Sequence, residues 1–251
     1  MPHAVRRVRR EPGGRVSERH SLFDTVADTM APVHTDGYKF LAVGVGVSLL
    51  LFLLWPPLAW LAVLITAWIA YFFRDPVRVT PLREGLVVAP ADGRICAIER
   101  RRPPAELGLG EGERVRVSIF LSVFDVHINR APVAGRIVRA IYVPGSFLNA
   151  ASDKASEENE RRATVIAAAG EEIAVVQIAG LIARRIVAFV KEGDSVGVGE
   201  RIGLIRFGSR VDLYLPPGHG ALVAVGQRAV GGETVIADLR SPEPEREARR
   251  Q

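Results

Sequence analysis

Cysteine is almost absent from this 251-residue chain, which has only Cys96. A single cysteine excludes a disulfide framework, a redox pair and a zinc site built on cysteines. Because Cys96 lies in a strand-like stretch, we expect it to act as a small buried hydrophobic residue. Histidine is also scarce, with five residues, so imidazole chemistry has few candidates.

Lysine is nearly as rare as cysteine. Only three of the 33 basic residues are lysines, so arginine carries the formal net charge of +5. Arginine stays ionised, and its planar guanidinium fits phosphate and carboxylate groups. A GC-rich coding sequence would give the same bias. We expect no nucleic-acid partner.

Charge is missing altogether from residues 40–73, whose two apolar halves flank Pro56 and Pro57. A membrane-spanning helix needs about 20 residues, although about 17 can suffice. A proline pair breaks a helix interior, so we expect a hairpin that turns at Pro56 and Pro57. Lys39 before the hairpin and Arg74 after it place both ends in the cytoplasm. The alternatives are a core hairpin of a soluble protein and, with less support, a signal peptide.

Short β-rich runs follow one another beyond residue 84, divided by glycine, proline and Asp-Gly turns. Such spacing favours a β-sandwich or barrel. Residues 190–207 have the pattern of a hairpin in lipoyl-type carrier domains, but no matching turn holds a lysine for a prosthetic group. We predict a mainly β fold: a compact sandwich or barrel-like domain with lipoyl-domain-like elements, preceded by a hydrophobic helical hairpin. The predicted segments are a polar Arg-rich tail (1–38), the anchoring hairpin (39–76), the β domain (77–240) and a charged, disordered tail (241–251).

Few residues of the β domain have a setting that suits catalysis. His127 ends an apolar run among polar neighbours, and functional residues concentrate at such loop positions. His219, in a Pro-Pro-Gly-His-Gly loop, has less support. Asp92 is first of all an Asp-Gly turn residue.

Gly208 and Ser209 interrupt what looks like one strand over residues 204–216. The hydrolase nucleophile elbow, Gly-x-Ser-x-Gly, is absent because Val211 replaces its second glycine. A different chemistry uses a Gly-Ser pair at a bend. The hydroxyl attacks the preceding carbonyl, the amide becomes an ester, and β-elimination cuts the chain and leads to an N-terminal pyruvoyl group. Glycine suits the first step because no side chain blocks the attack.

Five motifs, in order, make the chain resemble the short type of phosphatidylserine decarboxylase proenzyme: YFFRDPVR, VVAPADGRI, FLSVFDVHINRAPVAGRI, SFLNAASDKASEENER and RFGSRVDLYLP. The resemblance implies cleavage between Gly208 and Ser209. It implies a covalent pyruvoyl cofactor derived from Ser209, which forms a Schiff base with the substrate, and neither pyridoxal phosphate nor a metal. It also implies that Asp92 serves self-processing and that His127 serves decarboxylation.

The chain departs from the longer family members at two points. It has Phe-Gly-Ser-Arg in place of Leu-Gly-Ser-Thr, and Arg130 stands where those members carry a second histidine. That histidine is the base for self-cleavage. The resemblance therefore leaves the base open between His127 and Asp92.

The implied function is pyruvoyl-dependent decarboxylation of phosphatidylserine to phosphatidylethanolamine and CO2, at the cytoplasmic face of the cell membrane. Arg74, Arg78 and Arg130 are candidates for binding the phosphate. The expected partners are the phospholipid in the bilayer and the chain's own α and β pieces as a heterodimer. A homo-oligomer and another serine lipid, such as archaetidylserine, stay open.

Two other classes of protein also fit the sequence. One is a serine hydrolase that assembles Asp92, His127 and Ser209 into a triad. The other is a non-catalytic, membrane-anchored β-sandwich that acts as a binding module.

Overall fold

The computed structural model describes residues 31–146, 158–180, 185–206, 209–241, 243, 244, 246 and 248. Gly208, most of the two predicted tails and the motif stretch 147–157 lie outside these residues. The described residues form the helices α2 (Tyr38–Leu54) and α3 (Pro56–Phe72) and the 3-10 turns η1 (Thr35–Gly37) and η2 (Ala105–Leu107). They also form the strands β1 (Leu86–Val88), β2 (Gly93–Arg101), β3 (Arg114–Leu121), β4 (Ile128–Arg130), β5 (Gly135–Val143), β6 (Arg161–Ala168), β7 (Glu171–Ala179), β8 (Ile186–Ala188), β9 (Ser195–Val196), β10 (Arg201–Ile205), β11 (Ser209–Tyr214), β12 (Arg228–Ala229) and β13 (Val235–Asp238).

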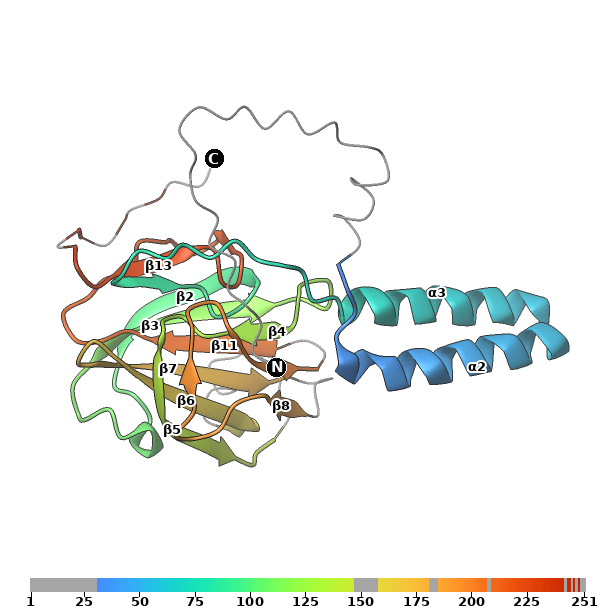
Figure 1. Cartoon of the computed structure of the whole chain (residues 1–251), viewed down its shortest axis with the longest axis horizontal. Helices are drawn as coiled ribbons and strands as arrows, with labels where there is room; N and C mark the ends of the chain where they lie inside the picture. Colours follow the sequence, from blue (N-terminus) through green and yellow to red (C-terminus); the bar gives the residue numbers. More distant parts are fainter. Residues whose placement is uncertain are drawn as a thin grey trace. The chain divides into compact units, whose positions relative to one another are not determined.

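Helices α2 and α3 lie side by side as a hairpin (Figure 1). The break falls at Trp55, which has an extended backbone. Pro56 and Pro57 are the first residues of α3, where a missing N–H leaves no helical bond unmade. The turn thus comes just before the prolines rather than at them. Gly44 allows close helix contact, because a Cβ there would lie 2.4 Å from Thr66 Oγ1.

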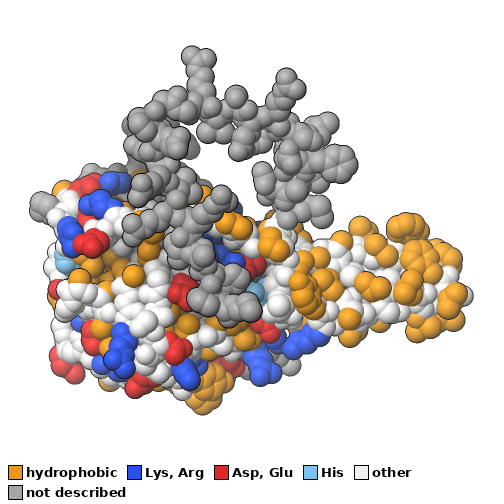
Figure 2. Space-filling model, in the orientation of Figure 1, with side chains coloured by type: hydrophobic (Ala, Val, Ile, Leu, Met, Phe, Trp, Pro, Cys, Tyr) orange, Lys and Arg blue, Asp and Glu red, His pale blue; other side chains and the backbone are white. Residues whose placement is uncertain are grey.

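The hairpin surface is apolar and exposed (Figure 2). Leu53 and Leu54 are 84% and 71% exposed. The helical stretch Thr35–Leu54 is long and apolar enough to cross a membrane, whereas Pro56–Phe72 is shorter. An exposed apolar surface of this kind marks a membrane or protein contact. The predicted apolar helix pair is confirmed.

The described strands form three sheets, so the expected mainly β fold is also confirmed. The largest sheet has eight strands in the order β12-β2-β3-β11-β7-β6-β5-β9, with β11 near its centre. A three-stranded sheet has the order β4-β10-β8, and β1 pairs with β13. The lipoyl-like stretch 190–207 does not form its own hairpin, because β9 pairs with β5 while β10 joins β4 and β8.

The predicted strand over residues 204–216 is two strands in different sheets. Strand β10 ends at Ile205 in the three-stranded sheet, and β11 begins at Ser209 in the large sheet. The interruption at Gly208 and Ser209 therefore marks a change of sheet.

The main hydrophobic core contains buried residues from all three sheets, among them Val87 of β1, Ile202 of β10 and Val211 of β11. A smaller cluster, which includes Val176 and Tyr214, lies on the other face of the large sheet. Along β11, residues that face the main core alternate with residues that face the smaller cluster, because side chains alternate along a strand.

Cys96 is exposed, contrary to expectation. The pairing of β2 with β3 shifts register between Ile95 and Ala97, so Cys96 is the extra residue of a bulge. The bulge turns its side chain away from the core, and its Sγ lies 3.4 Å from the Ser118 carbonyl oxygen.

Candidate active site

The fold brings Asp92, His127 and Ser209 to one end of strand β3. Ser209, the first residue of β11, lies directly opposite Leu121, the last residue of β3. Asp92 precedes β2, the other neighbour of β3. His127 follows the loop that leaves β3, and its carbonyl accepts a hydrogen bond from Ile205 N–H (3.2 Å). These three residues are far apart in the sequence, and they all lie at the end of β3 next to the junction between β10 and β11.

Ser209 is completely buried between β3 and β7. Its Oγ has no hydrogen-bond partner among the described residues. An unpaired hydroxyl in a core costs about 1–3 kcal/mol. Such an atom is unusual in a native structure, and a role in chemistry is one explanation for it.

His127 is also completely buried. Its Nδ1 lies 2.9 Å from the carbonyl oxygen of Asp125. A carbonyl only accepts, so Nδ1 carries the proton of the neutral ring and Nε2 holds a lone pair. Nε2 has no partner among the described residues. His127 thus presents an unused base to its surroundings.

Burial lowers the pKa of His127 to about 4. The carbonyl and carboxylate of Asp125 oppose this shift, and the positive charge of Arg74 adds to it. The Phe72 ring, at the end of α3, lies 4.3 Å from the imidazole centroid and forms part of its apolar surroundings. His127 is therefore neutral at physiological pH.

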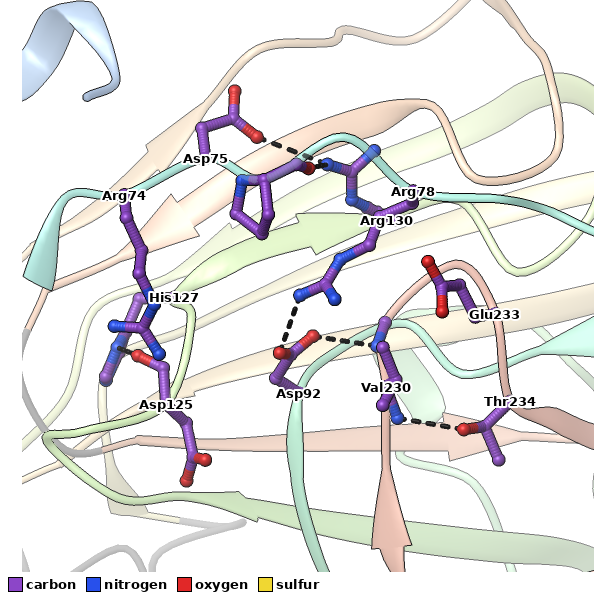
Figure 3. A network of polar contacts seen from close by, with 12 residues as sticks. Arg74, Asp75, Arg78, Asp92, Asp125, His127, Arg130, Val230, Glu233 and Thr234 are labelled. Carbon is purple, nitrogen blue, oxygen red and sulfur yellow. Dashed lines mark hydrogen bonds and ion pairs between the residues drawn. The ribbon is translucent and has the colours of Figure 1, made fainter. Parts of the chain in front are cut away.

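Asp125 fixes the loop that carries His127 (Figure 3). Its Oδ2 accepts from the backbone N–H of Ser122 (2.8 Å) and from the Ser122 hydroxyl (2.7 Å). Its Oδ1 pairs with Arg228, which begins β12. The sequence showed Asp125 only as a polar neighbour of His127; the Ser-x-x-Asp spacing was the available signal for this loop.

Asp92 is held from two sides (Figure 3). Its Oδ2 accepts from Arg78 at 2.7 Å, and its Oδ1 accepts from the backbone N–H of Gly231 at 2.8 Å. Burial raises the pKa of Asp92 above its usual range, although Arg78 beside it acts to lower the pKa. Arg78, a candidate for phosphate binding, thus has its charge paired within the protein.

The two other candidate arginines differ in their surroundings. Arg130 is 6% exposed, and its guanidinium donates to Asp75 Oδ1 (3.2 Å) and to the carbonyls of Pro76 and Gly199. Arg74 is less buried and donates to the Tyr71 and Phe124 carbonyls at 2.8 and 2.7 Å. Arg74 therefore lies nearest to a surface that could meet a phosphate.

The hydrolase triad is not assembled among the described contacts. In a triad, a carboxylate accepts from Nδ1 of the histidine. Here a backbone carbonyl occupies Nδ1 of His127, and the carboxylate of Asp92 binds Arg78 and Gly231. The described contacts thus leave His127 without a carboxylate partner at Nδ1, at the same end of β3 as the buried Ser209.

Comparisons with known proteins identify the family. The family model described as phosphatidylserine decarboxylase matches residues 65–237, which include Asp92, His127 and Ser209. A phosphatidylserine decarboxylase proenzyme of Cereibacter sphaeroides is 57% identical over 224 residues, which cover 89% of this chain and 97% of that protein. On both counts, the chain belongs to the phosphatidylserine decarboxylase family.

Proposed function

We propose that the chain is a proenzyme that cuts itself between Gly208 and Ser209 and then decarboxylates phosphatidylserine to phosphatidylethanolamine and CO2. The observation that carries this proposal is the unpaired hydroxyl of Ser209, buried at the same end of β3 as the free Nε2 of His127. Family membership supplies the reaction class.

Self-cleavage begins when Ser209 Oγ attacks the carbonyl carbon of Gly208 and passes its proton to His127 Nε2. The C–N bond between the two residues breaks, the nitrogen takes a proton, and an ester remains. Loss of the α-proton of residue 209 then expels the Gly208 carboxylate and leaves dehydroalanine. Water replaces its nitrogen, ammonia leaves, and residue 209 becomes a pyruvoyl group. His127 suits the first step because its lone pair is neutral and unshared.

The burial of residue 209 fits an uncharged N-terminus. An ordinary cut would place an ammonium group at the start of β11, at a position with 0% exposure. An unpaired buried charge costs several kcal/mol. A pyruvoyl end is neutral and has the size of the serine that it replaces, so the sheet can keep it.

The pyruvoyl carbonyl supplies an electron sink that bonds to the lipid amine and takes up the electron pair left by CO2. The protein residues exclude water and move the proton. We assign to His127 the return of a proton to the substrate α-carbon. Its position after the loop that leaves β3, at the same end of that strand as residue 209, supports this role. Phe72 packs on the imidazole ring of His127 and shields that side of the ring from water.

We further propose that the α2/α3 hairpin anchors the enzyme on the cytoplasmic face of the membrane. Its exposed apolar side chains suit a bilayer. Lys39 lies in the first turn of α2 and Arg74 follows α3, so positive charge flanks both ends. Arg74 thereby stands beside the hairpin exit, where a lipid phosphate would lie.

The decisive experiment is an intact-mass spectrum of the purified protein, paired with a decarboxylation assay on phosphatidylserine. We expect a chain of residues 1–208 and a chain of residues 209–251, the second with a blocked N-terminus that resists Edman sequencing. Ser209→Ala should give one uncut and inactive chain. Ser209→Cys should cleave slowly, because a thiolate can make the same shift.

Ser118→Ala is the matched control. Ser118 lies in β3, is completely buried, and has an Oγ without a partner among the described residues, as Ser209 does. It faces the opposite side of the sheet, because it pairs with Asp212 rather than with Val211. We expect normal cleavage in Ser118→Ala. A wild-type chain that is intact yet active would overturn the pyruvoyl mechanism.

A further inference from the structure

Two buried amides next to the candidate site have unmet hydrogen-bonding capacity. Asn129 of β4 and Gln177 of β7 are 0% and 1% exposed. Gln177 Nε2 donates to Asn129 Oδ1 at 2.7 Å. Asn129 Nδ2 and Gln177 Oε1 have no partner among the described residues. We call these two residues the amide pair; it holds one donor and one acceptor in reserve.

The amide pair adjoins both reacting residues. Ala179 lies opposite Ser209 and Gln177 lies opposite Val211, so all four share one face of the large sheet. Gln177 is therefore the diagonal neighbour of Ser209, about 7–8 Å away between Cα atoms and within reach of a long side chain. Asn129 lies two residues after His127, in β4, which is an edge strand of the three-stranded sheet.

Gly203 makes room for the amide pair. It lies opposite Asn129 in the β10/β4 pairing. A Cβ at this position would come within 2.8 Å of Gln177 Nε2. The pair therefore lies between the two sheets, on the strands next to those that carry Ser209 and His127.

Buried polar atoms without partners are costly, and four of them share this region. A ligand that brings both an acceptor and a donor would satisfy the amide pair. The amino acid part of a serine lipid does so: its carboxylate accepts, and its nitrogen donates.

We infer that the amide pair binds the amino acid part of the substrate, with Asn129 Nδ2 donating to the carboxylate and Gln177 Oε1 accepting from the nitrogen. This inference rests on the proposed function. A neutral amide orients the carboxylate without the full positive charge of an arginine, which would hold back its departure as neutral CO2. The product has no carboxylate, so it loses the bond to Asn129 and leaves more easily.

The test compares two short-chain lipids, dihexanoyl phosphatidylserine and dihexanoyl phosphatidylethanolamine, by trapping with cyanoborohydride. Adducts on the 209–251 chain are counted by intact mass, with and without the carboxyl group, across a range of lipid concentrations. Asn129→Asp retains the oxygen that accepts from Gln177 and replaces the spare donor with an acidic oxygen, which would repel the lipid carboxylate. It should raise the half-saturating concentration of the serine lipid about tenfold or more, and that of the ethanolamine lipid less than about twofold.

Ser118→Ala serves again as the control and should change the half-saturating concentration of neither lipid. Normal cleavage of Asn129→Asp with an unchanged ratio between the two lipids overturns the inference and leaves the proposed function intact. A wild-type chain that is not cleaved or not trapped by either lipid overturns both.

If the Asn129→Asp protein does not cleave itself, a measurement on the wild-type protein tests whether the lipid carboxylate is bound. The methyl ester of the serine lipid keeps the nitrogen and masks the negative carboxylate. It should need about tenfold more lipid for half-saturation than the unmodified serine lipid. Equal trapping of the two lipids overturns the inference.

Discussion

At the scale of single residues, burial sets the protonation state of His127. Its pKa of about 4 means that the ring is neutral at and above pH 5, and that it becomes protonated only as the pH falls through 4. A neutral ring is the form that can take the proton of Ser209. Self-cleavage should therefore proceed at a constant rate from pH 5 to 8 and decline below that range.

This prediction can be measured on pulse-labelled proenzyme made by cell-free translation into liposomes and shifted to each pH. An exposed histidine, with its pKa near 6.5, would already lose about tenfold in rate by pH 5.5. His127→Ala should stay uncut and give no decarboxylation, whereas His219→Ala should cleave normally. A half-maximal rate near pH 6.5 would refute the buried-base assignment.

The Asp92/Arg78 pair gives a second residue-scale prediction. Asp92→Asn removes the negative charge that lies 2.7 Å from the Arg78 guanidinium, at a largely buried position. The positive charge of Arg78 would then oppose the imidazolium that forms when Ser209 gives up its proton. We expect cleavage about tenfold slower or more, followed as the half-time of the two-chain product.

Asp238→Asn is the control for this pair. Asp238 is also a buried carboxylate paired with an arginine, Arg83, but it lies at the end of β13. It should leave the half-time unchanged. Equal slowing by both variants would mean that Asp92 matters only for the fold.

Ser209 and His127 could be identified as candidates because each stands in a local pattern, a strand interruption or a strand end. The local pattern of Asp92 predicted only a turn, and its role came from the family resemblance. It did not reveal the partners of the arginines. Arg78 meets Asp92 and Arg130 meets Asp75 only after distant segments fold together. Asn129 and Gln177 were missed for the same reason, since they are 48 residues apart.

At the scale of elements, the end of helix α3 contributes to the active site. Phe72 is completely buried and packs on His127. Phe72→Ala should lower the free energy of unfolding by about 3 kcal/mol or more, because it leaves a large cavity. Water entering that cavity should raise the pKa of His127 toward 6.5, so the acid limb of the cleavage profile should move upward from about pH 4.

Stability is best measured in the uncut Ser209→Ala background, and the acid limb in the cleaving protein. Phe52→Ala is the control, because Phe52 lies on α2, is 39% exposed, and packs on Trp60 instead. Phe52→Ala should change neither the free energy of unfolding nor the position of the acid limb by a comparable amount. An unmoved acid limb in Phe72→Ala would show that α3 does not shield His127.

Element types were easier to predict than element pairing. Residues 40–73 lack charge and residues beyond 84 have the texture of short strands, so a helix pair and a β domain followed. The sheet change between β10 and β11 could not be predicted, because the interruption at Gly208 and Ser209 does not show which sheet each half joins. Arg210 and Asp212 alternate with the apolar residues of β11, yet they are 2% and 1% exposed and pair with each other at 2.7 Å.

At the scale of the whole molecule, the hairpin should decide where the protein resides. The double variant Val47→Lys/Leu50→Lys would put two charges at exposed positions in the middle of α2, and so into the bilayer. Each costs about 2.5–3.5 kcal/mol at the centre of a spanning helix. We expect the double variant to float with liposomes much less than the wild type, and to remain cleaved. Flotation equal to that of the wild type would contradict the anchor.

The whole molecule also determines whether the two chains stay together after cleavage. The 209–251 chain contributes β11, between β3 and β7, as well as β12 and β13, which pair with β2 and β1. Its removal would leave unpaired edges on β2, β3 and β7 in the large sheet and expose Val211, Leu213 and Leu215, all at 0% exposure. Each such side chain contributes about 1.5–3 kcal/mol by its burial.

The two chains should therefore stay together after cleavage and separate only when the sheets unfold. We expect one peak containing both chains in size exclusion without denaturant. In a urea titration, release of the 209–251 chain should coincide with loss of the β-sheet circular dichroism signal. A short chain that elutes separately in native buffer would mean that β11 leaves the sheet once its peptide bond to residue 208 is cut, and a site that depends on residue 209 beside His127 could not then persist.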